Sequence, residues 1–338
     1  MKHLTFVVPS YNSQDYLARC VDTLLAGGED VEIIIVNDGS TDDTAAIADG
    51  YAAAHPTIVK VVHQENKGHG GAVNAGLAHA TGRYLKVVDS DDWLDIRGLA
   101  SVLSQMKNWE ENQLTVDMIV CNYVYDHLYD EKQHTVDYRN VFEANEICGW
   151  ENIGRFTPSQ YLIMHALIFN TEILRKSGVE LPLNTFYVDN LFAYQPLPYV
   201  KKICYLDVDL YHYFIGRDDQ SINESVMMER IDQQIKVTKI VSECTDLAAV
   251  EVSKLSTYMM RNISIMLAIS SIHLLLIGTD EALAKRKELW NHIKNINRKL
   301  YWKLRLQTVG GLTYLPGKIG GLATVTGYRA AKTVIKFQ

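Results

Sequence analysis

The stretch Tyr84 to Leu94 reads Y-L-K-V-V-D-S-D-D-W-L, and it decides how the rest of the chain is interpreted. Its first half is a short apolar run with β-branched residues, which predicts a buried strand. Three carboxylates follow, and Asp89 and Asp91 are spaced so that both can turn toward one point where the chain leaves extended geometry. Such a pair suits Mg²⁺ or Mn²⁺ with a diphosphate completing the coordination shell. An acidic turn that caps the following helix is the alternative interpretation.

Strands and helices alternate around this stretch. Residues 4–8, 31–36 and 58–62 are predicted strands, and apolar residues at helical spacing occupy 17–25. This alternation predicts a parallel, doubly wound sheet, in which ligands bind at the carboxyl ends of the strands. Four polar clusters follow predicted strands and would share one pocket: 9–12, 38–41, 65–68 and 89–92.

The motifs at these strand ends resemble those of family 2 glycosyltransferases. The matching segments, in the family's order, are V-V-P-S-Y-N (7–12), N-D-G-S-T-D-D-T (37–44), E-N-K-G (65–68), N-A-G-L (74–77), A-T-G (80–82) and V-D-S-D-D-W-L (88–94). The resemblance covers roughly residues 4 to 221. It implies a GT-A fold, which is a Rossmann-like, mostly parallel α/β sheet. It also implies a UDP-sugar donor, Mn²⁺ or Mg²⁺ as cofactor, and inversion at the anomeric carbon.

The resemblance also implies roles for individual residues. Asp91 would bind the metal, with His212 as a further ligand unless that histidine is structural. Asp189 would be the base that activates the acceptor hydroxyl, unless it only caps the helix that follows. Arg217, in a closing loop, would neutralise the charge of the leaving diphosphate. The residues assigned to nucleotide-sugar binding are Pro9, Tyr11, Asp38, Gly39, Lys67, Asn74, Asp89, Ser90 and Arg217.

Two positions depart from the family pattern. Val73 stands where many relatives carry an arginine, which leaves His69 as the nearest possible cation. Val188 stands where an acid is often found, so Asp189 would act alone. His165 lies among apolar residues, which is typical of a core histidine, with contact to the acceptor as the alternative.

The C-terminal part becomes helical and basic. From Glu281 onward the chain carries twelve Lys and Arg residues and two acidic residues, although the net charge of the whole chain is −7. Cations interleaved with Trp and Tyr over 285–305 favour peripheral contact with an anionic membrane over nucleic acid, and a solvated helical face is the alternative. The apolar run 263–277 is shorter than the roughly 20 residues of a spanning helix, so we expect a buried helix or a homo-oligomer interface.

Composition sets the remaining bounds. A chain of 338 residues with 47% apolar and 22% charged residues is typical of a globular protein of about two domains. We predict a catalytic domain at 1–222, with a nucleotide-binding half at 1–100 and an acceptor-binding half at 101–222, and a helical domain at 223–338. Five scattered cysteines favour a reducing compartment, and the N-terminus shows no signal peptide. The predicted location is therefore cytoplasmic, with possible attachment to the inner face of the cell membrane.

Together these features predict a metal-dependent, inverting transferase. It would move a hexose or N-acetylhexosamine from a UDP-sugar to a glycan or a lipid-linked saccharide. A sugar nucleotidyltransferase is disfavoured, because residues 9–12 stand where that class carries a glycine-rich loop ending in a basic residue. A non-catalytic, nucleotide-binding partner subunit of another glycosyltransferase is the remaining alternative, which Val73 and Val188 keep open.

Overall fold

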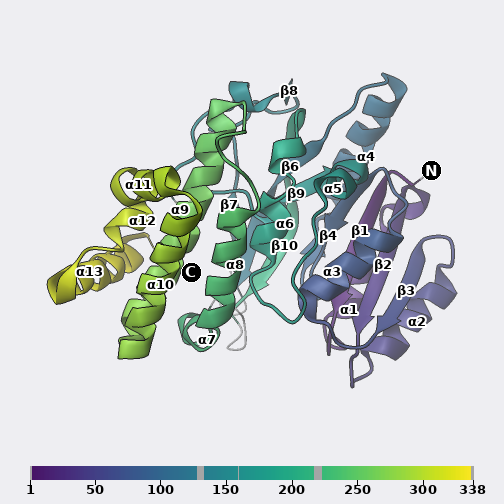
Figure 1. The fold of residues 1–338 in the computed structure, drawn as a ribbon. Helices are drawn as coiled ribbons and strands as arrows, with labels where there is room; N and C mark the ends of the chain where they lie inside the picture. Colours follow the sequence, from purple (N-terminus) through teal and green to yellow (C-terminus); the bar gives the residue numbers. More distant parts are fainter. Residues whose placement is uncertain (1, 128–132, 159, 217–222, 336–338) are drawn as a thin grey trace. The chain divides into compact units, whose positions relative to one another are not determined.

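The computed structural model describes residues 2–127, 133–158, 160–216 and 223–335, with side chains as far as residue 331. The chain divides into two compact units, residues 1–217 and 218–338. The first unit is built on a sheet, and the described part of the second is helical (Figure 1). The predicted α/β fold with a helical C-terminal region is therefore confirmed.

The first half of the sheet is parallel throughout. Its order is β3 (Val59–Gln64), β2 (Val31–Asp38), β1 (Leu4–Ser10) and β4 (Tyr84–Val87). Every residue of β1, β2 and β4 is buried, as expected for parallel strands covered on both faces. The three strands predicted before residue 63 are present, and each extends to the polar cluster that follows it.

The second half of the sheet is mixed. β9 (Leu167–Asn170) runs antiparallel between β4 and β6 (Met118–His127), and β6 is parallel to β10 (Ile203–Ile215). The short β5 (Trp93–Leu94) pairs with β10, so that Trp93 lies opposite His212. This pairing brings the end of the last strand next to the segment that follows Asp91. Two further strands, β7 (His134–Val136) and β8 (Ile147–Cys148), pair with β6 and β10.

Helices cover both faces of the sheet. α3 (Gly68–His79) packs on β1 and β2, and Gly76 permits this contact because a Cβ there would lie 2.1 Å from Val7 Cγ1. α1 (Leu17–Leu25) contacts both α2 (Thr44–Ala54) and α4 (Ile96–Glu111), which form a second layer. The remaining short helices of this unit are α5 (Thr171–Ser177), α6 (Asp189–Tyr194) and 3₁₀ turns at Gly28–Asp30, Trp150–Asn152, Met164–Ala166 and Leu197–Tyr199.

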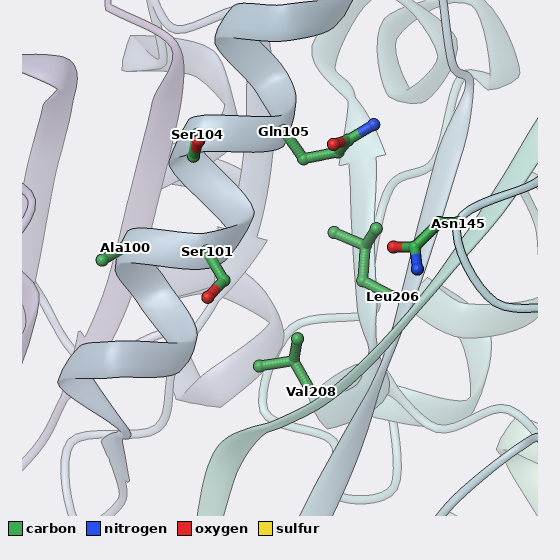
Figure 2. Close-up of a pocket in the computed structure, with 7 residues that line it drawn as sticks. All are labelled: Ala100, Ser101, Ser104, Gln105, Asn145, Leu206 and Val208. Atoms are coloured by element: carbon green, nitrogen blue, oxygen red, sulfur yellow. The ribbon is translucent and has the colours of Figure 1, made fainter.

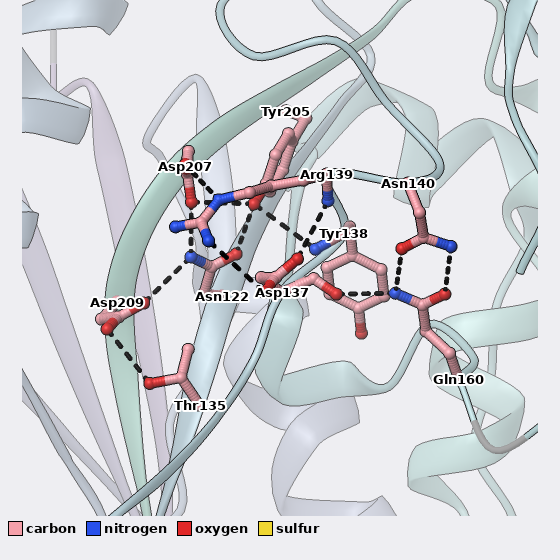
Figure 3. A network of polar contacts seen from close by, with 10 residues as sticks. All are labelled: Asn122, Thr135, Asp137, Tyr138, Arg139, Asn140, Gln160, Tyr205, Asp207 and Asp209. Atoms are coloured by element: carbon pink, nitrogen blue, oxygen red, sulfur yellow. Dashed lines mark hydrogen bonds and ion pairs between the residues drawn. The ribbon is translucent and has the colours of Figure 1, made fainter. Parts of the chain in front are cut away.

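A polar network fastens the segment after β7 to the irregular middle of β10 (Figure 3). The Asn122 amide donates to both Asp207 and Asp209 at 2.9 Å. Arg139 Nε donates to Asp207 Oδ2 at 2.7 Å. Because each carboxylate has several donors, this network fixes the segment after β7 to β10.

The second unit packs around one long helix. Its elements are α7 (Glu224–Glu229), α8 (Ile231–Glu243), α9 (Ser253–Ile277), α10 (Asp280–Ile296), α11 (Arg298–Gln307), α12 (Val309–Leu312) and α13 (Gly317–Ile335). α9 contacts α7, α8, α10, α12 and α13. Trp290, which we assigned to a membrane interface, is fully buried and donates to Ser271 Oγ at 3.0 Å. That part of the interfacial assignment was wrong.

α9 is also longer than the sequence suggested. It has 25 residues, starting ten residues before the apolar run, and it is the one described helix that is long and apolar enough to cross a membrane. The length argument against a spanning helix was therefore wrong. The most apolar window of α9 is 44% buried within the protein, and the core helix of a soluble unit meets the same criteria.

Candidate active site

The loop after β4 is held mainly through its backbone and through Ser90. Ser90 Oγ lies 2.7 Å from Ser13 Oγ, which joins the loop to the end of β1. Arg19 donates to the carbonyl of Asp91 at 2.7 Å while its guanidinium lies over the Trp93 ring at 3.9 Å. α4 is capped by Asp95, whose carboxylate accepts from Gly98 N at 2.6 Å. The alternative in which Asp89 to Asp92 cap this helix is therefore wrong.

Asp92 is the structural member of the three acids. Its side chain is fully buried, one oxygen accepts from Tyr211 OH at 2.5 Å, and the other accepts from Phe214 N at 2.8 Å. Burial raises the pKa of this carboxyl well above its ordinary value, and the charges of Asp91 and Asp89 add to the increase. Asp92 therefore ties the acidic loop to β10, whereas Asp89 and Asp91 are both partly exposed.

Asp89 pairs with His69, the nearest possible cation to the position of Val73. His69 Nε2 lies 2.8 Å from Asp89 Oδ1, and both side chains are partly exposed. Burial alone would lower the pKa of His69, but the charge of Asp89 and the hydrogen bond to it outweigh burial, so this pKa is raised. Burial alone would raise the pKa of Asp89, but His69 lowers it overall. His69 is thus the group in this pair whose protonated form Asp89 stabilises, one helical turn before Val73.

A second group of assigned residues lies at the end of β2. Asp38 is buried, and its Oδ1 accepts from Gln64 Nε2 at 2.6 Å and from the backbone N of Lys67 at 2.9 Å. Gly39 has φ of +72°, and a Cβ there would lie 2.8 Å from Asn66 N, so only glycine fits. The Lys67 side chain is exposed.

The end of β1 carries one buried and one exposed residue. Pro9 is buried within the strand, whereas Tyr11 is 52% exposed. Asn12, with φ of +49°, accepts from Thr41 N at 2.9 Å, and its own backbone N donates to Ser40 Oγ at 3.0 Å. These bonds join the loops after β1 and β2, and they leave the ring of Tyr11 at the surface, where a planar base can stack on it.

Asn74 links α3 to the segment that leads to Asp189. Its amide nitrogen donates to Leu181 O at 2.9 Å, and its Oδ1 accepts from Leu181 N at 2.9 Å. The backbone N of Asn184 donates to Lys67 O at 2.8 Å. The structure thus gives Asn74 a positioning role that the sequence did not indicate. A donor contact by Asn74 stays a prediction.

Asp189 is the first residue of α6 and follows a strained turn. Tyr187 has φ of +65°, which is rare for a bulky residue and typical of functional turns. The N-cap of α6 is Val188, so Asp189 does not occupy the capping position. Burial raises the pKa of the Asp189 carboxyl, His69 opposes the increase, and Asp89 adds to it. These mutual effects mean that Asp189 lies within electrostatic range of the His69–Asp89 pair.

Two features bear on metal binding, the predicted ligand His212 and a set of three possible ligands among the described residues. His212 Nδ1 lies 2.5 Å from Asp126 Oδ2, and its ring stacks on Trp93 with centroids 5.3 Å apart. A carboxylate that holds one nitrogen of a histidine leaves the other as a metal ligand. The set of three is Asp89, Asp92 and His165, whose ligand atoms lie within 4.8 Å of one another. Both oxygens of Asp92 already accept hydrogen bonds, which makes this set the poorer fit.

A buried lysine lies beneath the acidic loop, and sequence reasoning did not single it out. Lys86 is fully buried and donates to His165 O at 2.6 Å, with its ammonium 4.9 Å from the centroid of the Tyr211 ring. Burial lowers the pKa of Lys86 to about 8 and that of His165 to about 4. His165 is therefore neutral near pH 7, and it stacks on Tyr211 as a core residue. A lysine within a predicted buried strand was the signal for this group.

A cavity of about 490 Å³ lies between α4 and β10 (Figure 2). Its described lining consists of Ala100, Ser101, Ser104, Gln105, Asn145, Leu206 and Val208. None of the residues assigned to the site belongs to this lining. Arg217 lies outside the described residues, so its assignment stays a prediction.

Comparison with known proteins identifies relatives of this chain. Residues 5–171 match the model of the family described as glycosyl transferase family 2. The chain is 27% identical over 228 residues to EpsH of Bacillus subtilis (strain 168), which is described as a glycosyltransferase, and this match covers 63% of the chain and 60% of EpsH. It is 36% identical over 130 residues to the glycosyltransferase GlyG of Streptococcus pneumoniae serotype 4, covering 38% of the chain and 40% of GlyG. The matches thus span less than two thirds of either relative.

A solved structure extends the likeness to nearly the whole chain. Residues 1–349 of TarS from S. aureus, in complex with UDP-GlcNAc, superpose with a TM-score of 0.71 at 17% identity. The match covers 98% of this chain and 92% of that one. At this identity the likeness shows a shared fold, and it confirms the GT-A sheet with a helical C-terminal region.

Proposed function

Because this chain belongs to glycosyltransferase family 2, we propose that it moves a hexose or N-acetylhexosamine from a UDP-sugar to a glycan or a lipid-linked saccharide. The acceptor oxygen would attack the anomeric carbon as the bond from that carbon to the diphosphate oxygen breaks, which inverts the configuration. UDP would leave, and the acceptor proton would pass to a carboxylate of the enzyme.

The observation that carries this proposal is the grouping of His69, Asp89 and Asp189. His69 and Asp89 lie 2.8 Å apart, and both act on the pKa of Asp189, which His69 lowers and Asp89 raises. A carboxyl with a raised pKa is a stronger base once ionised, and Asp189 stands at a helix start where an acceptor can approach. The His69–Asp89 pair adds a fixed dipole near the donor phosphates.

The residues at the ends of β1 and β2 suit a nucleotide. Tyr11 offers an exposed ring for a base, and Asp38 and Gly39 form a tight turn that a ribose can approach closely. The TarS structure that shares this fold holds UDP-GlcNAc, and a second TarS structure holds UDP. A more distant match, with a TM-score of 0.50, is the mannosyltransferase PcManGT in complex with GDP-Man and Mn²⁺. These matches favour a nucleotide-sugar, and within that class we propose UDP.

The donor set of the acidic loop fits a hard divalent cation such as Mn²⁺ or Mg²⁺. We assign Asp91 and His212 as its ligands, because Asp126 orients His212 and because Asp91 is partly exposed. A cation there would offset the charge of the leaving diphosphate. Asp92 keeps the loop in place without being a ligand, and Arg217 remains a predicted further contact to the diphosphate.

The test is UDP release from a panel of UDP-sugars, with Mn²⁺ or Mg²⁺ and candidate acceptors, together with UDP binding by calorimetry. Asp189→Asn should keep UDP affinity and lose at least about 10²-fold in turnover, the usual contribution of a general base. Asp91→Ala should lose the metal dependence. Glu180→Gln, an exposed acid in the same segment as Asp189, is the matched control and should behave like the wild type.

Two outcomes would contradict the proposal. Full turnover by Asp189→Asn would mean that another group takes the proton. UDP binding without release from any donor and acceptor would favour the non-catalytic partner subunit.

A further inference from the structure

The last three helices expose an unusual number of large apolar side chains. The exposed fractions are 73% for Leu306, 55% for Val309 and 65% for Leu312. Ile319 is 85% exposed and Leu322 is 69% exposed. Scattered exposed leucines are ordinary, but several on consecutive helices indicate an interaction surface.

These helices form one packed layer rather than loose ends. α12 is fixed to α9, because Gly310 N donates to Ser264 Oγ at 2.9 Å and a Cβ on Gly310 would lie 3.0 Å from Ser264 O. α13 is fixed to α12 by the hydroxyl of Thr324, which donates to Leu312 O at 3.2 Å. The five apolar residues are exposed on these helices, which are yellow in Figure 1, whereas Leu300 and Leu304 of α11 are buried.

Cations accompany the apolar residues on the same faces. On α11, Lys299, Trp302, Lys303 and Leu306 stand at i, i+3, i+4 and i+7, which is one side of a helix. All four are exposed, and Trp302 is 47% exposed. On α13 the exposed Lys318 directly precedes Ile319. The side chains of these lysines can therefore reach charges that lie level with the leucines.

The C-terminal region that contains these helices is purely basic. The fifty residues 289–338 contain nine Lys and Arg residues and no Asp or Glu. Not all of these cations are on the surface, because Arg305 donates to Gly311 O at 2.7 Å within the layer. The exposed lysines and the exposed leucines are what a partner would meet.

We propose that the outer face of α11 to α13 inserts into the headgroup region of an anionic phospholipid membrane. We name this face the apolar–basic surface, and we define it by Lys299, Trp302, Lys303, Leu306, Leu312 and Ile319. Leucine and isoleucine side chains enter the acyl boundary while lysines pair with lipid phosphates, which is the arrangement of interfacial helices. The membrane contact predicted from the sequence at residues 285–305 thus loses its α10 part, keeps its α11 part and extends to Ile319 in α13.

Charge and chemistry disfavour the other occupants. A second copy of this chain would bring two basic faces together without an acid between them, and like charges repel. A nucleic acid would satisfy the lysines but would leave the aliphatic side chains exposed to water, since phosphate contacts come from polar groups. An anionic bilayer satisfies both kinds of side chain.

The test is flotation of the whole chain with vesicles of phosphatidylcholine, with and without phosphatidylglycerol, at low and high salt. The triple variant Leu306→Ser, Leu312→Ser, Ile319→Ser should bind at least about tenfold more weakly, because each leucine buried contributes more than 1 kcal/mol. In the double variant Lys299→Glu, Lys303→Glu, the affinity for anionic vesicles should fall about fivefold or more for each exchange. Leu283→Ser in α10 and Lys176→Glu in α5 are the matched exposed controls and should bind as the wild type does.

Each other outcome overturns the proposal. The first is that the wild type binds neither kind of vesicle, and the second is that the triple variant still floats with them. The third is that the wild type self-associates in sedimentation and the triple variant does not. The fourth is that the chain binds RNA but no vesicles. Flotation needs no donor sugar, and UDP release from a soluble donor should be the same in both multiple variants and the wild type. Failure of the membrane proposal and failure of the transferase proposal are therefore distinguishable.

Discussion

Replacing Asn74 with alanine should slow sugar transfer while leaving UDP affinity unchanged. The Asn74 side chain makes two hydrogen bonds of 2.9 Å to the backbone of Leu181, and together with the bond from Asn184 N to Lys67 O they hold the segment before Asp189 against the start of α3. In the variant this segment is free to move, so Asp189 spends less time where an acceptor hydroxyl can transfer its proton.

The loss of stability in Asn74→Ala follows from the two backbone groups of Leu181 that lose their hydrogen-bond partner. Leu181 is 2% exposed, so its N–H and its C=O both lose their partner in a buried position. Each such loss costs about 1–3 kcal/mol. Because Asn74 itself is partly exposed and water can enter, we expect about 2 kcal/mol in total, which is a fall in Tm of about 4–8 °C for a unit of this size.

Three measurements separate the positioning role from a donor contact. Thermal unfolding gives the loss of stability, calorimetry gives UDP affinity, and UDP release gives turnover. We expect turnover to fall at least about tenfold, because a misplacement of about 1 Å at the reacting group has larger effects than this. Asn108→Ala, on the exposed face of α4, is the control and should change the free energy of unfolding by less than about 0.5 kcal/mol.

Two results would refute this reasoning. If UDP affinity falls tenfold while Tm is unchanged, Asn74 contacts the donor and does not hold the Leu181 segment. If Asn74→Asp behaves like the wild type, the donated bond to Leu181 O is unimportant, because an ionised aspartate has no proton to donate there.

Three further predictions concern the frame of the site. Gly39→Ala should destabilise the protein by about 2 kcal/mol through its φ of +72°, whereas Gly50→Ala, in open space within α2, should stabilise it by up to about 1 kcal/mol; equal Tm values for the two variants would contradict this. Tyr211→Phe should cost about 1–3 kcal/mol in urea unfolding, because it leaves one oxygen of the buried Asp92 without a donor. The pKa of Glu32 is lowered, because the bonds it accepts outweigh the effect of burial, so its contribution is present above its ordinary pKa and is lost as pH falls through the lowered value. The stability difference between wild type and Glu32→Gln should therefore be smaller at about pH 3 than at about pH 7, and a difference that grows toward acid would contradict the sign.

The sequence predicted the fold well where a signal is local. The strands at 4–8 and 31–36 are mostly apolar runs, each with one polar residue, Thr5 or Glu32, and a polar cluster marks the end of each one. The acidic stretch after β4 was recognised for the same reason, since its residues are adjacent in the chain. Local signals of this kind need no knowledge of the partner strand.

Features that depend on distant partners were missed. Asn74 and Leu181 are 107 positions apart, and Lys86 and His165 are 79 positions apart. Nothing near Asn74 in the sequence indicates that its amide will be matched by a backbone group from another segment. Trp290 was misassigned in the same way, because burial is decided by the helices that pack on it.

The three acids after β4 show why the site needs more carboxylates than its chemistry uses. Asp92 accepts bonds from Tyr211 and from Phe214, which fixes the loop to β10 and keeps that carboxyl out of any reaction. Asp89 is paired with His69, and Asp91 is partly exposed. A site that stabilises charge in a transition state must hold its groups in place before the substrate arrives. One buried acid therefore holds a loop whose other two acids are partly exposed, so loss of Asp92 should disturb the proposed metal site without removing any of its proposed ligands.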